Sequence, residues 1–260
     1  DLGPLSILTG SRGKQMLLYI VFFSLAGSVL SVGSAALFLL FPKSIRKVLV
    51  PCLISYATGT LLGAAFLGMI PAGLKHAPAF AVSSTVLAGI VLFFVLEKLV
   101  LWRHCHDGDC EVHSRAGPLI LIGDAFHNFV DGVVIAAAFL TSVPLGIAAS
   151  LAVIAHEIPQ EVGDFAILLD SGYSRRKALI LNTLSASSTL PGALIAYFWL
   201  DEMSGAVPYI LAISAASFIY IATADLIPGL HREVTGNAVW RQLLLLLAGV
   251  GTIAVFHHGG

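Results

Sequence analysis

Apolar runs long enough to cross a lipid bilayer recur along nearly the whole chain, and short polar segments separate them. A helix needs roughly 17 to 25 such residues to span the hydrocarbon core. The runs lack the strict alternation of a membrane β-barrel, so helices are expected to satisfy the backbone in lipid. We predict an all-α integral membrane protein with eight transmembrane helices, at about residues 16 to 41, 48 to 74, 80 to 102, 118 to 142, 145 to 170, 178 to 200, 206 to 229 and 238 to 256.

The amino-acid composition argues against a soluble globular protein. Of the 260 residues, 57% are hydrophobic and 11% charged, and the mean hydropathy is +0.92. A soluble domain cannot hide that much apolar surface. Neither a linker nor a low-complexity tract divides the chain, so we expect one transmembrane domain over residues 1–260. The first dozen residues lack a basic region followed by a short apolar core, and no signal peptide is expected.

Basic residues gather in the segments after spans one, three, five and seven, and the opposite side of the membrane receives few of them. By the positive-inside rule, both termini are expected on the non-cytoplasmic side of a cell (inner) membrane. The basic residues on the predicted cytoplasmic side are Lys43, Arg46, Lys47, Lys98, Arg103, Arg115, Arg175, Arg176, Lys177, Arg232 and Arg241.

A weak internal repeat links the second and seventh spans. Span two ends in GMIPAGLKH (68–76), and span seven ends in DLIPGLHRE (225–233). With eight spans these two helices cross the membrane in opposite directions, as an inverted repeat requires. The sequence thus favours spans 1–3 as the inverted counterpart of spans 6–8, around central spans 4 and 5.

The one substantial polar loop, residues 103–117, concentrates histidine and cysteine on the predicted cytoplasmic side. Imidazole and thiolate suit zinc and similar metals. The spacing matches no closed structural zinc site, so a weak metal acceptor is one interpretation and a solvated polar loop is the other. The candidate loop ligands are His104, Cys105, His106, Cys110 and His113.

Spans four and five carry polar faces inside their apolar runs. Span four places Asp124, His127, Asn128 and Asp131 at i, i+3, i+4 and i+7, which is one helical face. An acid near the centre of an inserting helix costs on the order of 2.5 to 3.5 kcal/mol. Span five places five polar residues on two adjacent stripes, namely His156, Glu157, Gln160, Glu161 and Asp164.

Acids predominate in this set, and neither span contains a lysine or arginine. Hydrogen bonds that merely hold the helix bundle together are the alternative to a site. A bound cation neutralises the acids better, and oxygen with imidazole ligands favours a divalent ion over copper(I). Pro159 lies inside the cluster and is expected to kink the helix beside the ligands. Transporters place binding sites at such broken helices.

The segments HNFVDG (127–132) and HEIPQEVGDFAILLDSG (156–172) closely resemble the Zrt/Irt-like (ZIP) metal-transporter family, in the subfamily with HNxxDG in span four and HExPHE in span five. The eight spans, the histidine-bearing loop and DLIP (225–228) agree with it. The resemblance implies uptake of Zn²⁺, or of Cd²⁺, Fe²⁺ or Mn²⁺, into the cytoplasm by alternating access. It implies no catalytic cofactor.

The resemblance also implies a ligand set. One metal is expected on His127, Asp131, His156 and Gln160, and an adjoining metal on Asn128, Asp131, Glu157 and Gln160. Glu161 and Asp164 resemble a route beneath these sites, and Asp225 resembles an acidic position on the exit side of span seven. Gln160 departs from the histidine usual there and predicts looser metal selectivity.

Two rival functions remain at this stage. A metal-gated channel or sensor would need the same ligands. An intramembrane zinc metalloprotease would need HExxH, and this chain has Gln160 at the second histidine position and a proline within the motif, so an enzyme is not expected. The expected partners are a lipid bilayer and divalent metal ions, and a homodimer is a further candidate. No nucleic-acid partner is expected.

Overall fold

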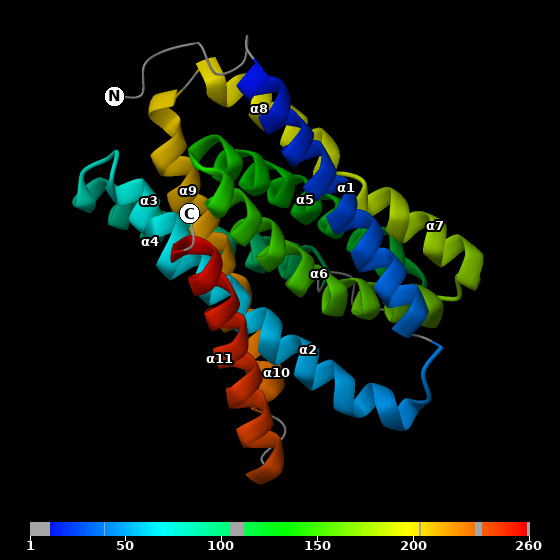
Figure 1. Ribbon diagram of the computed structural model, residues 1–260. Helices are drawn as coiled ribbons and strands as arrows, with labels where there is room; N and C mark the ends of the chain where they lie inside the picture. Colours follow the sequence, from blue (N-terminus) through cyan, green and yellow to red (C-terminus); the bar gives the residue numbers. More distant parts are fainter. Residues whose placement is uncertain (1–10, 39, 105–111, 203, 232–235, 259–260) are drawn as a thin grey trace.

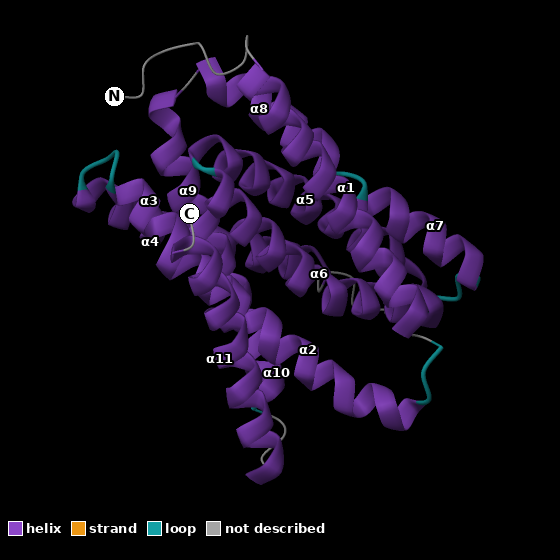
Figure 2. Ribbon diagram, in the orientation of Figure 1, coloured by secondary structure: helices purple, strands orange, loops and turns teal. Residues whose placement is uncertain are grey.

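The computed structural model describes residues 11–38, 40–104, 112–202, 204–231 and 236–258. Every regular element among these residues is a helix (Figure 2). Eight helices in the described part are long and apolar enough to cross a membrane. The prediction of an all-α membrane protein with eight spans is therefore confirmed. The spans are 13–38, 47–74, 79–96, 121–141, 143–169, 175–199, 207–230 and 236–256.

Several spans are built from more than one helical segment. Spans one, three, four, five and eight are single helices, whereas spans two, six and seven contain breaks or changes of helix type. In chain order, the elements are α1 (Ser11–Phe38), α2 (Lys43–Gly63), η1 (Ala64–Met69), α3 (Ile70–Leu74), α4 (Ala79–His104), α5 (Val112–Thr141), α6 (Val143–Asp170), α7 (Arg175–Ala186), α8 (Thr189–Glu202), η2 (Ser204–Ala206), α9 (Val207–Tyr220), η3 (Ile221–Leu226), α10 (Ile227–Leu230) and α11 (Gly236–His258).

The helices extend into the polar segment predicted as a loop over 103–117. α4 continues to His104, and α5 already begins at Val112, so the predicted loop is too long at both ends. A helix need not end where its apolar run ends, because its backbone hydrogen bonds are made within the helix itself. Cys105, His106 and Cys110 lie outside the described residues, as do the side chains of His104 and His113, so the loop metal site stays a prediction.

Two short π-helical segments mark the related spans two and seven. Each is six residues long and directly precedes an Ile-Pro pair, η1 before Ile70 and η3 before Ile227. A proline removes a backbone donor and clashes with the preceding turn, and a wider π turn accommodates it. The shared Ile-Pro in the sequence thus corresponds to a shared change of helix geometry.

The packing of the helices follows the same internal relation. α2 packs against α11, and α4 packs against α9. α1 packs against α6, and α5 packs against α8. Suppose that spans one, two and three are exchanged with spans six, seven and eight, and span four with span five. The contact of α2 with α11 then becomes that of α9 with α4, and the contact of α1 with α6 becomes that of α8 with α5. In Figure 1, α5 and α6 (green) form the centre, with α1 and α8 on one side and α9 and α11 on the other.

Close contact of α5 with α8 depends on two glycines. A Cβ atom on Gly132 would lie 1.9 Å from the carbonyl oxygen of Thr189, and one on Gly192 would lie 2.1 Å from that of Phe129. The two backbones therefore touch directly, as small residues permit between membrane helices. This contact brings Thr189 against the polar face of α5.

Span six is interrupted between α7 and α8. Pro191 has no N–H group for the carbonyl of Ser187, so a continuous helix would lose a hydrogen bond there. At the break, the carbonyl oxygen of Ala186 accepts hydrogen bonds from Ser28 Oγ at 2.8 Å and Thr189 Oγ1 at 2.9 Å. Leu190 N–H donates to the Ser187 carbonyl, and the two hydroxyl groups take its place at the Ala186 carbonyl. The break lies beside the polar face of α5.

Candidate metal site

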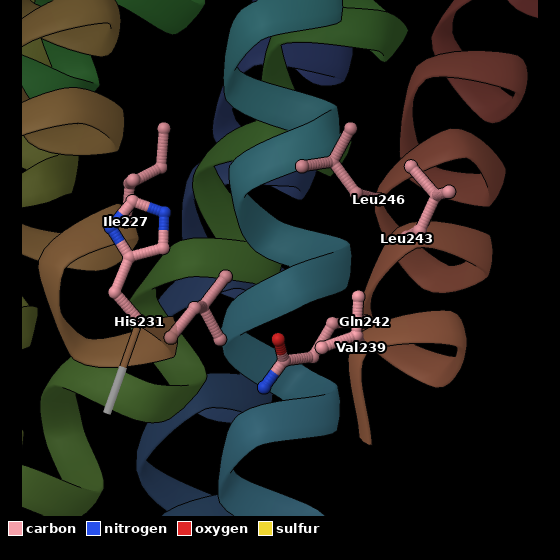
Figure 3. Close-up of a pocket in the computed structure, with 7 residues that line it drawn as sticks. Ile227, His231, Val239, Gln242, Leu243 and Leu246 are labelled. Atoms are coloured by element: carbon pink, nitrogen blue, oxygen red, sulfur yellow. The ribbon is translucent and has the colours of Figure 1, made fainter. Parts of the chain in front are cut away.

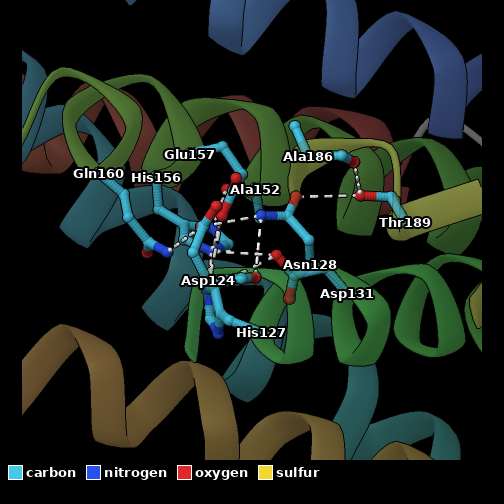
Figure 4. Close-up of polar contacts among 10 residues, drawn as sticks. All are labelled: Asp124, His127, Asn128, Asp131, Ala152, His156, Glu157, Gln160, Ala186 and Thr189. Atoms are coloured by element: carbon cyan, nitrogen blue, oxygen red, sulfur yellow. Dashed lines mark hydrogen bonds and ion pairs between the residues drawn. The ribbon is translucent and has the colours of Figure 1, made fainter. Parts of the chain in front are cut away.

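The polar faces of α5 and α6 meet inside the helix bundle (Figure 4). Four side chains converge there, two from each helix: His127, Asp131, His156 and Glu157. One ligand atom from each lies within 4.8 Å of all the others. Ligands of one zinc ion, at about 2.0 to 2.2 Å from the metal, lie no more than about 4.4 Å from one another. The four groups are therefore close enough together to be candidates for the ligands of one ion.

The distances within this histidine site are short. His156 Nε2 lies 3.2 Å from Asp131 Oδ2 and 3.5 Å from Glu157 Oε1. His127 Nε2 lies 3.7 Å and 3.5 Å from the same two oxygens. The two Nε2 atoms are 3.2 Å apart. Two imidazole lone pairs repel at that distance unless a proton or a cation lies between them.

The orientation of His156 prepares it to bind a metal. Its Nδ1 lies 2.9 Å from the carbonyl oxygen of Ala152, one turn earlier in α6. An Nδ1–H group that donates to this carbonyl leaves the lone pair on Nε2, which faces the acids. Metal-binding histidines in proteins are commonly fixed in this way.

The acids of this site are buried and lack hydrogen bonds. Asp131 is 0% exposed and Glu157 is 2% exposed. None of their four carboxylate oxygens has a hydrogen-bond partner in the described residues. An unpaired buried carboxylate is costly, and no lysine or arginine occurs from 121 to 170 to compensate for it. A divalent cation is one partner that such a group of oxygens could accept.

Asn128 and Gln160 use their amide groups within the protein. Asn128 Nδ2 and Gln160 Nε2 donate to Asp124 Oδ1 at 3.0 Å and 3.2 Å. Asn128 Oδ1 accepts a hydrogen bond from Thr189 Oγ1 at 3.0 Å. Of the four ligands expected for the first metal, the structure gathers His127, Asp131 and His156, with Glu157 as the fourth group. The ligand roles of Asn128 and Gln160 stay predictions.

A second acidic cluster adjoins the histidine site. Asp124, Glu157 and Glu161 each place one carboxylate oxygen within 4.8 Å of the others. Glu157 belongs to both clusters. Asp164, on the same helix, interacts with Asp124. Glu161 also accepts a hydrogen bond from the amide of Asn182 in α7.

Sequence reasoning placed Asp124 on the polar face but omitted it from the ligands, and it did not identify Asn182 or Thr189. Asp124 had a usable signal, because it begins the i, i+3, i+4, i+7 series of span four. Asn182 and Thr189 are single polar residues in span six, and only the packing of that span reveals their partners.

Asp225 belongs to neither cluster. It lies in η3 and its side chain is exposed. The predicted kink at Pro159 also stays a prediction, since α6 continues as one helix from Val143 to Asp170 with this proline inside it.

A cavity of about 470 Å³ lies between α10 and α11 (Figure 3). Its lining is largely aliphatic, and His231 and Gln242 are the polar side chains in it. It contains no carboxylate, so it does not offer the ligand set that a divalent cation needs. Among the described residues, the groups of side chains that could hold a metal ion lie between α5 and α6.

Comparison with known proteins finds one family. A family model described as "ZIP Zinc transporter" matches residues 102–257. Zinc transporter SLC39A7 of Mus musculus is 30% identical over 329 residues, which cover 89% of this chain and 69% of that protein. Zinc transporter ZIP13 of Pongo abelii is 34% identical over 226 residues, covering 78% of this chain and 66% of the relative.

The match to zinc transporter ZIP4 of Homo sapiens covers a shorter segment of this chain than the two matches above. It is 43% identical over 136 residues, which cover 52% of this chain and 20% of that protein. The chain thus spans about two thirds of the length of ZIP13 and a fifth of that of ZIP4.

Proposed function

This chain belongs to the ZIP zinc transporter family, and from that premise we propose that it moves zinc and related divalent cations across a membrane through the histidine site between α5 and α6. It is a transporter and not an enzyme. The observation that carries the proposal is the set of buried carboxylate oxygens of Asp131 and Glu157, which face two histidines and have no lysine or arginine partner among the described residues. A passing cation neutralises them.

The proposed direction is into the cytoplasm. Basic residues after spans one, three, five and seven support an orientation with both termini outside. We propose alternating access as the mechanism, with the group formed by α1, α5, α6, α7 and α8 moving against α2, α4, α9 and α11. The ligands lie on α5 and α6, so such a motion carries the whole site.

Uptake into liposomes tests the function. Purified protein is reconstituted into liposomes that contain a zinc-sensitive dye, and zinc is added outside. We expect saturable uptake with a strong temperature dependence, because each transported ion requires a conformational change. Empty liposomes serve as the control. Dye signal equal to that of empty liposomes would contradict the proposal.

A channel would behave differently when the same purified protein is reconstituted. An open pore conducts without a conformational cycle, so single-channel currents in planar bilayers would favour it over a carrier. A sensor would bind zinc and produce no uptake. The metalloprotease rival finds no support, because α6 presents Gln160 at the second histidine position of HExxH.

Gln160→His is expected to sharpen selectivity for zinc. Histidine adds an imidazole ligand that zinc prefers and that manganese binds less well. We expect the ratio of zinc to manganese uptake to rise about tenfold, the lower end of typical effects for groups around a metal. Competition between the two ions in the liposome assay measures it. An unchanged ratio would show that residue 160 does not face the transported ion.

The membrane of residence, the orientation of the termini, the single-domain organisation and a homodimer stay predictions. Cadmium, iron and manganese are proposed as further cargo because they accept the same oxygen and imidazole ligands.

A further inference from the structure

The cavity between α10 and α11 opens on the outer surface of the helix bundle (Figure 3). Two of the residues that line it, Val239 and Leu243, are 47% and 43% exposed. Span seven ends at residue 230 and span eight begins at residue 236, so the cavity lies where both spans meet one surface of the membrane. Lipid molecules therefore surround its opening.

The cavity has the size and the lining of a site for one hydrocarbon chain. Its volume of about 470 Å³ lies within the range of about 300 to 1,000 Å³ that ligand sites occupy. Along α11 it extends from Val239 to Leu246, which is about 10 Å at the rise of a helix. One leaflet of the hydrocarbon core is about 15 Å thick, so a lipid chain reaches the whole length of the cavity. The aliphatic lining consists of Ile227, Leu230, Val239, Leu243 and Leu246.

The polar side chains of the cavity indicate what accompanies the hydrocarbon chain. They are His231 and Gln242. Gln242 Nε2 is buried and has no hydrogen-bond partner among the described residues. A buried amide donor without an acceptor is costly. Its missing partner is an acceptor oxygen, which neither a metal cation nor a plain hydrocarbon supplies.

The charge of the neighbouring sequence favours a phosphate group near this amide. From residue 231 to residue 241 the chain has two arginines, Arg232 and Arg241, and one acid, Glu233. Basic segments at the ends of membrane helices attract lipid phosphates. A phospholipid carries ester and phosphate oxygens directly above its acyl chains, so one molecule offers both the acceptor and the hydrocarbon.

We propose that this cavity binds one phospholipid of the surrounding bilayer. An acyl chain lies against the aliphatic lining, and an ester or phosphate oxygen accepts a hydrogen bond from the Gln242 amide. α10 and α11 both pack on α2, so the lipid fills the space that these two helices leave between them and links the ends of spans seven and eight. The site is separate from the histidine site and does not depend on the transport function.

Lipid binding to the purified protein tests this site. Protein in detergent is titrated with palmitoyl-oleoyl phosphatidylglycerol, and native mass spectrometry counts the bound lipids. We expect one lipid to bind at least tenfold more tightly than all later ones, and the unfolding temperature to rise with lipid concentration. Glycerol 3-phosphate has the phosphate but no acyl chain, and it is expected to leave the unfolding temperature unchanged.

Two tryptophan variants of α11 separate the cavity from the rest of the lipid-facing surface. Leu243→Trp fills the cavity and is expected to lose the tightly bound lipid. Leu244→Trp is the matched control, because Leu244 is 65% exposed and does not line the cavity, and it is expected to keep the lipid. Gln242→Leu is expected to weaken binding about fivefold, which corresponds to one neutral hydrogen bond. Val239→Phe narrows the same cavity and replaces Leu243→Trp if that variant does not fold.

The absence of one tightly bound lipid in the parent, or its retention in folded Leu243→Trp, would overturn the site. Loss of the lipid in both tryptophan variants would do the same, because it would assign the binding to the general surface of α11. Unchanged affinity in Gln242→Leu would remove the amide from the proposal. A dimer of the parent that Leu243→Trp dissociates would show that a second copy of the chain, and not a lipid, occupies the cavity.

Discussion

His156→Ala is expected to reduce zinc uptake to the level of empty liposomes. Its Nε2 is 3.2 Å from both Asp131 Oδ2 and His127 Nε2, so its ring lies at the centre of the proposed site. Its removal leaves two buried acids facing one histidine. Partners of metal ligands already change affinity about 10- to 100-fold, and loss of a ligand is expected to cost at least 100-fold in the rate at low zinc.

Ser150→Ala is the matched control for this variant. Ser150 is buried in the same helix, and its hydroxyl group bonds the carbonyl of Gly146 one turn earlier. It touches neither cluster, so uptake is expected to equal that of the parent. Near-normal uptake by His156→Ala, in protein that elutes as a single folded species, would place the transported ion elsewhere and reduce the polar faces to interhelical contacts.

Gly132→Ala is expected to lower the thermal stability of the protein in detergent more than any other single methyl addition to α5. The new Cβ would lie 1.9 Å from the carbonyl oxygen of Thr189 and 2.7 Å from the nitrogen of Ala193. Both are backbone atoms and cannot rotate away. The two helices must therefore move apart to make room for the methyl group. Overpacking of this kind lowers the free energy of unfolding by about 1 to 3 kcal/mol or more.

Gly123→Ala provides the comparison in the same helix. A Cβ at Gly123 meets no atom within 4 Å, and alanine favours a helix over glycine by about 1 kcal/mol. The unfolding temperature of this variant is expected to stay equal or rise. Equal temperatures for the two variants would mean that α5 and α8 pack less closely than the structure indicates. A further consequence of Gly132→Ala is loss of the Thr189 to Asn128 hydrogen bond.

Much of the fold follows from local sequence. Apolar runs of the right length located the ends of the eight spans to within three residues, except the end of span three, which was expected at 102 and lies at 96, because the hydrocarbon core requires that length in any helix. The Ile-Pro pairs in spans two and seven pointed to the inverted relation, which the π-helical segments and the paired helix contacts then bear out. The break in span six was not predicted, although the polar segment NTLSASST (182–189) and Pro191 interrupt its apolar run.

The sequence identified most residues of the site, but it did not show which of them lie next to one another. Helical periodicity placed His127 and Asp131 on one face and His156 and Glu157 on another, and the absence of lysine and arginine indicated a cation. Periodicity says nothing about the rotation of one helix against another. That rotation determines that Glu157 completes the histidine site, while Gln160 donates a hydrogen bond to Asp124.

By itself, the sequence determined the class of protein, the positions of its helices and the two helical faces that carry its chemistry, because hydrophobic length and helical periodicity are local properties. The tertiary structure decided which oxygens remain without partners, since that depends on contacts between distant segments. Asn182 and Thr189, from span six, bond Glu161 and Asn128 only because α7 and α8 pack against α5 and α6. Close packing of glycines on α5 and α8 makes that contact possible.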